Sequence, residues 1–220
     1  MTDILDKFIG QAKENVASGY YGTSGIERPA VKKNSLAGAL KKNSFSLIAE
    51  IKHASPAGEY SFEHIDIPAV AKAFRECGAD AVSVVVEPKI FMGKLGHIPV
   101  VKNSSGLPVL FKDFVVDEKQ IEAAAFYGAD CMLLVYSVAK RLGFDVNLFI
   151  SKAHSLGLEV LLECYDSDEL KAALGTKADI LGINNSKLRT LKVELGHTKR
   201  LVDSVGGIYA LGRALISECG

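Results

Sequence analysis

Two side chains of opposite charge, Glu50 and Lys52, stand two residues apart at the end of a short apolar run. In a β-strand, residues i and i+2 point to the same face, so this carboxylate and this ammonium project side by side. Placing both groups in a packed core is costly unless they are paired or solvated. The segment therefore indicates either a catalytic pair or a surface ion pair on an edge strand, and alone it does not decide between them.

The amino-acid composition disfavours several functional classes. The 220 residues carry 26 basic and 26 acidic side chains, and no long block of like charge favours nucleic acid or an anionic membrane as a partner. The N-terminus lacks a signal-peptide apolar core, and no apolar run reaches the roughly 20 residues that span a bilayer. The four cysteines lack Cys-x-x-Cys spacing, so no zinc or redox motif is indicated. We expect a cytoplasmic protein without a metal site, in which Cys131 and Cys164 are buried apolar residues.

From Ser46 onward, short apolar runs alternate with longer amphipathic segments. Strands are predicted at Ser46–Lys52, Asp80–Glu87, Pro108–Asp113, Asp130–Val135, Glu159–Glu163, Asp179–Asn184 and Ala214–Glu218. Helices are predicted at Ile67–Glu76, Glu118–Tyr127, Asn147–Leu156, Asp168–Leu174 and Glu194–Val205. Three of these helices are followed by an Ala-Asp pair at the start of the next strand. In two of the three cases a glycine, which is common at helix ends, precedes the pair. This alternation predicts right-handed βαβ units and a parallel sheet.

The strand ends favour one of two α/β architectures. Polar side chains recur at the C-terminal ends of nearly all predicted strands, namely Glu50, Lys52, Glu87, Lys112, Asp113, Glu163, Asn184 and Glu218. Active sites of (β/α)8 TIM barrels are built from these ends, whereas a doubly wound sheet gathers its ligands at one switch point. No Gly-x-Gly-x-x-Gly follows the first strand, which disfavours dinucleotide binding. Residues 46–220 are therefore predicted to form strands one to seven of a TIM barrel.

The first 45 residues do not share this repeat. Asp3–Ser18 is predicted to be helical, because Ile4, Phe8, Ala12 and Val16 follow helical spacing. A polar stretch and a second short helix at Ser35–Lys41 follow. We expect residues 1–45 to be an N-terminal helical extension that caps one end of the barrel or acts as a lid.

Five segments together resemble indole-3-glycerol phosphate synthase, a barrel enzyme of tryptophan biosynthesis. They are Ala49-Glu-Ile-Lys-His-Ala-Ser-Pro56, Leu110-Phe-Lys-Asp-Phe114, Leu161-Leu-Glu-Cys164, Gly182-Ile-Asn-Asn185 and Ser217-Glu-Cys-Gly220. Each alone is a weak signal, but all five occur in the family's order and approximate spacing. The resemblance covers essentially the whole chain. It implies a carboxy-lyase that closes the indole ring of an anilino-deoxyribulose phosphate, with loss of carbon dioxide and water and without a cofactor.

The resemblance also implies catalytic roles for individual residues. Lys112 would be the general acid that polarises the substrate carbonyl during ring closure. Lys52 and Glu50 would serve later proton transfers and dehydration, and Glu163 would stabilise developing positive charge. We expect the two lysines at one barrel mouth to lower each other's pKa, while the two carboxylates oppose that effect. The alternative for each residue is a barrel-mouth ion pair that holds strands in register.

Further residues would position or contact the substrate. Asn184 and Glu218 would position the sugar hydroxyls and the reacting chain. The expected substrate contacts are Ser55, Phe91, Phe114, Leu188, Cys219 and Gly220. The two phenylalanines would provide apolar walls for the flat anthranilate ring, with ordinary core packing as the alternative. Ser55 and Gly220 fall at positions on the phosphate side.

Three features depart from the family's pattern. Where the family has Asn-Arg-Asp, this chain has Asn185-Ser186-Lys187, so a substrate-holding arginine is replaced, and a lysine cannot reproduce its planar fork. Cys219 replaces a serine with a weak thiol donor. The sequence stops at Gly220, before the family's eighth strand and its Gly-Ser phosphate loop. We expect a longer enzyme, and the alternatives are a barrel completed by a partner or an inactive remnant.

Three functions therefore compete. The first is the carbon–carbon lyase that makes indole-3-glycerol phosphate from a small sugar-phosphate substrate. The second is another sugar-phosphate barrel enzyme, such as the neighbouring isomerase of the same pathway. The third is a non-catalytic barrel that binds a phosphate ligand or a partner subunit. The set Glu50, Lys52, Lys112 and Glu163 favours the first function, and the sequence does not indicate an oligomeric state.

Overall fold

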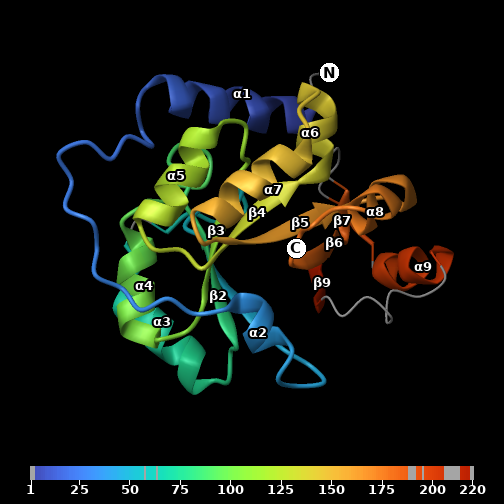
Figure 1. Ribbon diagram of the computed structural model, residues 1–220. Helices are drawn as coiled ribbons and strands as arrows, with labels where there is room; N and C mark the ends of the chain where they lie inside the picture. The colour runs from blue at the N-terminus through green and yellow to red at the C-terminus, as the bar shows by residue number, and fades with distance from the viewer. Residues whose placement is uncertain are drawn as a thin grey trace.

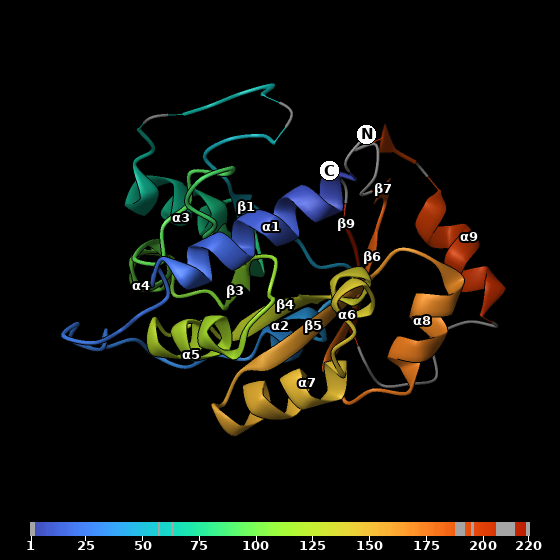
Figure 2. The ribbon, with the colours of Figure 1, turned by 90° about the horizontal axis from the view of Figure 1, so that it is seen from above.

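The computed structural model describes residues 3–56, 58–62, 64–187, 192–194, 196–205 and 214–218, of which 187, 192 and 214–218 are described by their backbone alone. The described strands form a curled parallel sheet in the order β1-β2-β3-β4-β5-β6-β9, with helices around its outside (Figures 1 and 2). The strands are β1 (Ile48–Ile51), β2 (Ala81–Val85), β3 (Val109–Lys112), β4 (Cys131–Val135), β5 (Glu159–Cys164), β6 (Ile180–Asn184) and β9 (Ala214–Glu218). This confirms the predicted barrel-type α/β fold with strands one to seven.

The outer helices mostly begin at an acidic N-cap. They are α3 (Ile67–Glu76), α4 (His97–Ser105), α5 (Glu118–Phe126), α6 (Tyr136–Leu142), α7 (Val146–Ser155), α8 (Ser167–Leu174) and α9 (His197–Ser204). Asp66, for example, accepts a hydrogen bond from the N–H of Ala69, and Asp117 forms a capping box with Gln120. None of the helices in the described part of the chain is long and apolar enough to cross a membrane.

Two helices and a hairpin were not predicted. α4 and α6 have no side-chain cap, and Pro99 stands in the first turn of α4, where its missing N–H costs no helical hydrogen bond. α6 begins directly at the end of β4, so no loop residues announce it. The antiparallel hairpin of β7 (Ser186–Lys187) and β8 (Lys192–Val193) follows β6.

The alternation along each strand divides the apolar residues into two clusters. Phe111 and Leu162 pack between the sheet and the outer helices, whereas Leu110 and Leu161 belong to a second cluster on the inner face. Two residues beyond each of these inner leucines, the same face becomes polar, at Lys112 and Glu163. The inner face of the sheet is therefore apolar along the strands and charged where the strands end. Two of the cysteines, Cys131 and Cys164, are buried as predicted.

The repeated Ala-Asp pairs fasten neighbouring strands at the N-terminal end of the sheet. Each aspartate precedes one strand and accepts a hydrogen bond from a backbone N–H at the start of the preceding strand. The bonds join Asp80 to Leu47 (2.9 Å), Asp130 to Val109 (2.9 Å) and Asp179 to Val160 (2.8 Å). They fix the starts of three strand pairs, β1–β2, β3–β4 and β5–β6.

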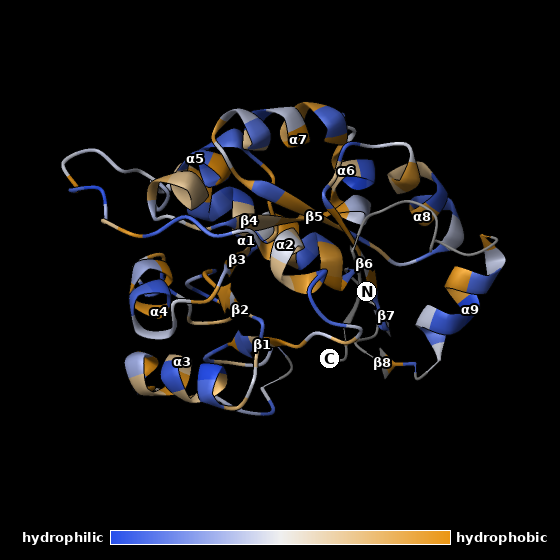
Figure 3. Cartoon of the chain, turned by 60° about the horizontal axis from the view of Figure 1, so that its bottom comes forward, coloured by the Kyte–Doolittle hydropathy of each residue, from blue (hydrophilic) through white to orange (hydrophobic). Residues whose placement is uncertain are grey.

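The N-terminal extension contacts both ends of the barrel. α1 (Ile4–Ala17) lies over the C-terminal strand ends, where Asn15 donates a hydrogen bond to Glu87 at 2.8 Å (Figure 2). α2 (Leu36–Leu40) lies at the opposite end, where Glu159 of β5 accepts from the N–H of Leu36 at 2.7 Å (Figure 3). The extension thus contacts both ends of the barrel, whereas we expected it to cover one. The domain boundary at residue 45 stays a prediction.

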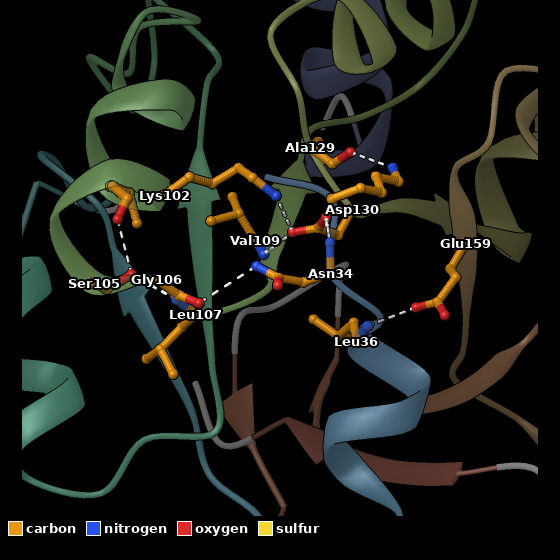
Figure 4. Close-up of polar contacts among 12 residues, drawn as sticks. Asn34, Leu36, Lys102, Ser105, Gly106, Leu107, Val109, Ala129, Asp130 and Glu159 are labelled. Carbon is orange, nitrogen blue, oxygen red and sulfur yellow. Dashed lines mark hydrogen bonds and ion pairs between the residues drawn. The ribbon is translucent and has the colours of Figure 1, made fainter. Parts of the chain in front are cut away.

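Near α2, at the N-terminal end of the sheet, a buried ion pair between two residues of the barrel also binds the extension (Figure 4). Lys102 of α4 donates to Asp130 at 2.5 Å, and the two side chains are 2% and 0% exposed. Asp130 also accepts from the backbone N–H groups of Asn34 at 2.7 Å and Val109. Since the carboxylate is fully buried, removing Lys102 would leave a charge without its counter-ion.

Candidate functional site

A cavity of about 280 Å³ opens at the C-terminal end of the sheet, against α1. Its lining combines charged side chains with phenyl rings. All predicted site residues whose side chains are described line it, namely Glu50, Lys52, Ser55, Phe91, Lys112, Phe114, Glu163 and Asn184. The structure therefore brings together residues that lie up to 134 positions apart along the chain.

The remaining predicted residues fall outside this description. Leu188, Cys219 and Gly220 lie outside the described residues. Glu218 is described by its backbone, which pairs with Asn184 across β6 and β9. Within the described part of the chain, no three His, Cys, Asp or Glu side chains are placed to hold a metal ion.

Glu50 lies at the centre of the charged group. Its Oε2 accepts hydrogen bonds from Lys112 Nζ at 3.2 Å and from Ser83 Oγ at 3.0 Å, and its Oε1 lies 3.7 Å from Lys52 Nζ. Glu50 and Ser83 are register partners across β1 and β2, which explains their contact. The three charged side chains are only 18–28% exposed. They are therefore not a surface ion pair, although β1 is a terminal strand of the sheet among the described residues.

Lys52 is held in its charged form. Burial lowers its pKa, but a hydrogen bond with Tyr60 and the charge of Glu50 raise it more, so the pKa of Lys52 lies above its usual value. Lys112 lowers the pKa by a smaller amount. The expected mutual lowering is thus present at Lys52 but is outweighed by the opposing groups. Lys52 can stabilise negative charge at neutral pH or give a proton to a strongly basic leaving group.

Glu163 and Asn184 form a second polar group. Glu163 is 5% exposed, and its Oε1 accepts from Asn184 Nδ2 at 3.0 Å. The other side of the amide, Asn184 Oδ1, accepts from the backbone N–H of Ser186 at 2.7 Å. Because both ends of the amide are bound, the Glu163 carboxylate has a fixed orientation at the cavity wall. Ser186 also lines this wall and brings no charge where the resemblance had implied an arginine.

Three phenylalanine rings form the apolar wall. Phe8 of α1 stacks on Phe114 with ring centroids 4.6 Å apart, and its ring lies 5.7 Å from that of Phe91. The part of the cavity that these three rings line, called the aromatic slot below, offers apolar contact to a flat aromatic group. Phe8 was predicted only as part of the apolar face of a helix. No sequence signal shows which part of the barrel that face covers.

Ser55 lies on a loop that folds back on itself after β1. The N–H of Ser55 donates to the carbonyl of Tyr60 at 3.1 Å, and the N–H of Phe62 donates to the carbonyl of His53 at 2.8 Å. The Ser55 hydroxyl donates to Glu59 Oε2 at 3.1 Å. The buried hydroxyl is therefore held at the margin of the cavity, together with a carboxylate that a bound anion would displace.

Glu87 and Asp113 line the cavity but mainly hold the scaffold. Besides Asn15, Glu87 binds the N–H groups of Lys89, Ile90 and Phe91 and so shapes the loop of Phe91. Asp113 accepts from Tyr21 at 2.6 Å and from Gln120 at 3.2 Å. Some polar residues at the strand ends of this barrel thus line the candidate site, and others mainly hold its loops and helices in place.

The pH dependence of stability tests the state of Asp113. Burial raises its pKa to about 7, although hydrogen bonds from Tyr21, Gln120 and the Phe114 N–H lower it. The pKa of Asp113 is higher in the folded than in the unfolded protein, so the protonated carboxyl stabilises the fold. This stabilisation is fully present below about pH 4 and is lost as pH rises to about 7. We predict that the unfolding free energy of the wild type minus that of Asp113→Asn falls across this window, by up to about 1.4 kcal/mol per pH unit. Urea unfolding at several pH values measures it, and a difference that rises with pH would contradict the raised pKa.

Comparisons with known proteins agree with the fold and with the resemblance of the sequence. Two solved structures share the fold, the N-acetylmannosamine-6-phosphate 2-epimerase from Clostridium perfringens (TM-score 0.52, 13% identity, 86% of this chain and 93% of that chain) and the citrate synthase SbnG (TM-score 0.56, 12% identity, 84% and 82%). At these identities they support the architecture alone.

Curated relatives are much more similar in sequence. The indole-3-glycerol phosphate synthase of Caldanaerobacter subterraneus is 39% identical over 191 residues, which cover 87% of this chain and 72% of the relative. The synthase of Bacillus mycoides is 36% identical (91% and 78%), and that of Desulfotalea psychrophila is 34% identical (100% and 85%). The model of the family "Indole-3-glycerol phosphate synthase" matches residues 6–220. With its site residues gathered in one cavity at the C-terminal strand ends, this chain belongs to the indole-3-glycerol phosphate synthase family.

Proposed function

We propose that this chain converts 1-(2-carboxyphenylamino)-1-deoxyribulose 5-phosphate into indole-3-glycerol phosphate, carbon dioxide and water, as a carboxy-lyase of tryptophan biosynthesis. Family membership supports this proposal and disfavours the isomerase alternative. One observation carries it: Glu50, bound to Lys112 and close to Lys52, faces the same cavity as the slot of phenyl rings. A flat anthranilate ring and acid–base groups would then meet at one place.

Ring closure is the step assigned to Lys112. As the ring carbon that bears the carboxylate attacks the ketone carbon, the carbonyl electron pair moves to oxygen, which takes a proton from the Lys112 ammonium. Positive charge develops on the anilino nitrogen, and the Glu163 carboxylate stabilises it. The electron pair of the bond to the carboxylate then restores the aromatic ring as carbon dioxide leaves.

Dehydration is assigned to Glu50 and Lys52. The hydroxyl formed from the ketone leaves with a proton from Lys52, while Glu50 takes a proton from the neighbouring carbon. The two electrons of that C–H bond form the indole double bond, and water is released. Since Glu50 lies 3.7 Å from Lys52, the proton it has taken can return to the lysine for the next cycle. Lys112 regains its proton from solvent, because loss of the carboxylate as carbon dioxide consumes one proton overall.

The remaining site residues are proposed to hold the substrate. Asn184 and Glu218 would orient the sugar chain, and Ser55 and Gly220 would bind the phosphate, for which the Glu59 carboxylate must leave the Ser55 hydroxyl. Phe91, Phe114, Leu188 and Cys219 complete the proposed contacts. Because the sequence has no long block of like charge, we propose no nucleic-acid or membrane partner. We also propose a cytoplasmic location.

The decisive assay is the appearance of indole fluorescence when the protein is mixed with the anilino-deoxyribulose phosphate. We expect turnover in the presence of a metal chelator, because every proposed step uses side chains of the chain itself. A folded protein that binds the product but shows no turnover would favour the alternative, a non-catalytic phosphate-binding barrel. The uncharged Ser186 in the cavity wall is the observation that keeps this alternative in view.

Replacing Phe8 by leucine tests the aromatic slot. Leucine retains apolar volume but removes the ring that stacks on Phe114. We expect KM to rise about two- to tenfold, the equivalent of about 0.5–1.5 kcal/mol for an aromatic pair, with little change in kcat. Steady-state kinetics measures both constants, and Phe45→Leu is the matched control because Phe45 is 80% exposed. A fall in kcat at constant KM would argue against a binding slot.

A further inference from the structure

Two histidine rings stack behind the cavity wall, outside the proposed chemistry. His53 follows Lys52 directly on the loop after β1, and His97 is the first residue of α4. Their ring centroids are 4.9 Å apart and their planes differ by 17°. The Nδ1 atom of each ring is buried and has no hydrogen-bond partner among the described residues. The two rings therefore contact each other by stacking, with no hydrogen bond to Nδ1 from a described residue to hold either ring in place.

The stack joins two loops that both line the cavity. Lys52 and Ser55 flank His53 on the first loop, and Phe91 belongs to the second, which leads into α4. Next to the stack, the N–H of Ala54 donates to the carbonyl of Phe91 at 3.2 Å. Separating the two rings would therefore move a proposed catalytic lysine and a proposed phosphate ligand away from the aromatic wall.

The surroundings of the pair oppose a positive charge. Burial lowers the pKa of His53, and Lys94 lowers it further. Burial, His53 and Lys94 together lower the pKa of His97 to about 4. No carboxylate of the described residues offsets these effects at either ring. A proton added at Nδ1 would also create a buried N–H donor without an acceptor.

We infer that His53 and His97 are positioning residues, whose neutral stack holds the loop of Lys52 and Ser55 against the loop of Phe91 and opens when either ring is protonated. Because both folded pKa values lie below the unfolded value near 6.5, the contribution of the stack is complete above about pH 6.5 and is lost as pH falls toward 4. The inference rests on the proposed function only for its kinetic consequence.

The kinetic test compares the wild type with the double variant His53→Phe/His97→Phe. Phenylalanine keeps a flat ring in each position and cannot take up a proton. We expect the ratio of wild-type to variant kcat/KM to stay near one at pH 7.5, to begin to fall below about pH 6.5 and to be lower by about fivefold or more near pH 4, through a rise in the wild-type KM. All other titrating groups are shared, so the ratio isolates the pair. His154→Gln is the control, since this exposed histidine binds Asp179 and neither residue lines the cavity. A double-variant ratio that stays constant would overturn the inference.

Hydrogen exchange tests the same contact without substrate. The relevant amides are those of Ala54 and Phe62, which are bonded within and across the two loops. After correction for intrinsic rates, we expect their protection to fall between pH 7.5 and pH 4 in the wild type but not in the double variant. Should the double variant not fold, His97→Phe alone removes one of the two protonation sites. Unchanged wild-type protection would overturn the inference. If the exchange pattern is as predicted but the protein shows no turnover at any pH, the proposed function is wrong and this inference still holds.

Discussion

Replacing Lys112 by methionine is expected to lower kcat/KM by about a thousandfold, within the range that loss of a general acid produces. Methionine has a similar length and fills similar space but cannot donate a proton to the substrate carbonyl. The fold should be retained, because the partner of Lys112, Glu50, is 28% exposed and keeps its contacts with Ser83 and Lys52. The indole fluorescence assay measures the loss, and circular dichroism confirms the fold.

Lys119→Met is the matched control for this variant. Lys119 is exposed on α5, so its replacement should leave kcat and KM unchanged. Binding of the product to Lys112→Met, measured by calorimetry, separates chemistry from recognition. If binding persists while turnover is lost, the effect lies in the chemical step. Retention of more than about a tenth of the activity would remove Lys112 from the role of general acid.

The largest loss of stability is expected at the opposite end of the barrel. Lys102→Met should lower the free energy of unfolding by about 3–5 kcal/mol, because it leaves the fully buried Asp130 carboxylate without its counter-ion. Such a loss is a large part of the roughly 5–15 kcal/mol that stabilises a typical domain. Urea unfolding at pH 7 measures the difference.

Lys72→Met provides the comparison for this second variant. Lys72 forms an exposed ion pair with Glu76 at 3.8 Å, in which the side chains are 70% and 64% exposed. Its loss should change the unfolding free energy by less than about 1 kcal/mol. A similarly small effect of Lys102→Met would mean that the backbone N–H groups of Asn34 and Val109 satisfy Asp130 without the lysine.

Most of the fold could be predicted because hydrophobic alternation depends on local sequence. The bounds predicted for α3 and β9 are those of the structure, and the other predicted strands deviate by at most two residues at either end. α4 and α6 were missed because their first residues carry none of the signals that mark a helix start. Pro99 and the β-branched Val100 and Val101 further disguise α4.

The site was predictable to the extent that strand geometry determines it. The spacing of Glu50 and Lys52 predicted a shared face, and the structure places both in one cavity. The contributions of Phe8 and Ser83 depend on contacts between distant segments, which periodicity does not encode. Nor does the sequence show that the Glu87 and Asp113 carboxylates accept hydrogen bonds from Asn15 and Tyr21, residues that support the fold.

The two-ended attachment of the N-terminal extension has a consequence for the order of folding. Its lower contacts join Asn34 to Asp130 and Leu36 to Glu159, which are 96 and 123 positions apart. Contacts of such separation close only after the intervening chain has collapsed, and here they require β4 and β5 to be in place. During synthesis the first residues to emerge are therefore among the last to dock. Phe8 belongs to the same extension, so the aromatic wall that Phe91 and Phe114 of the barrel begin gains its third ring late.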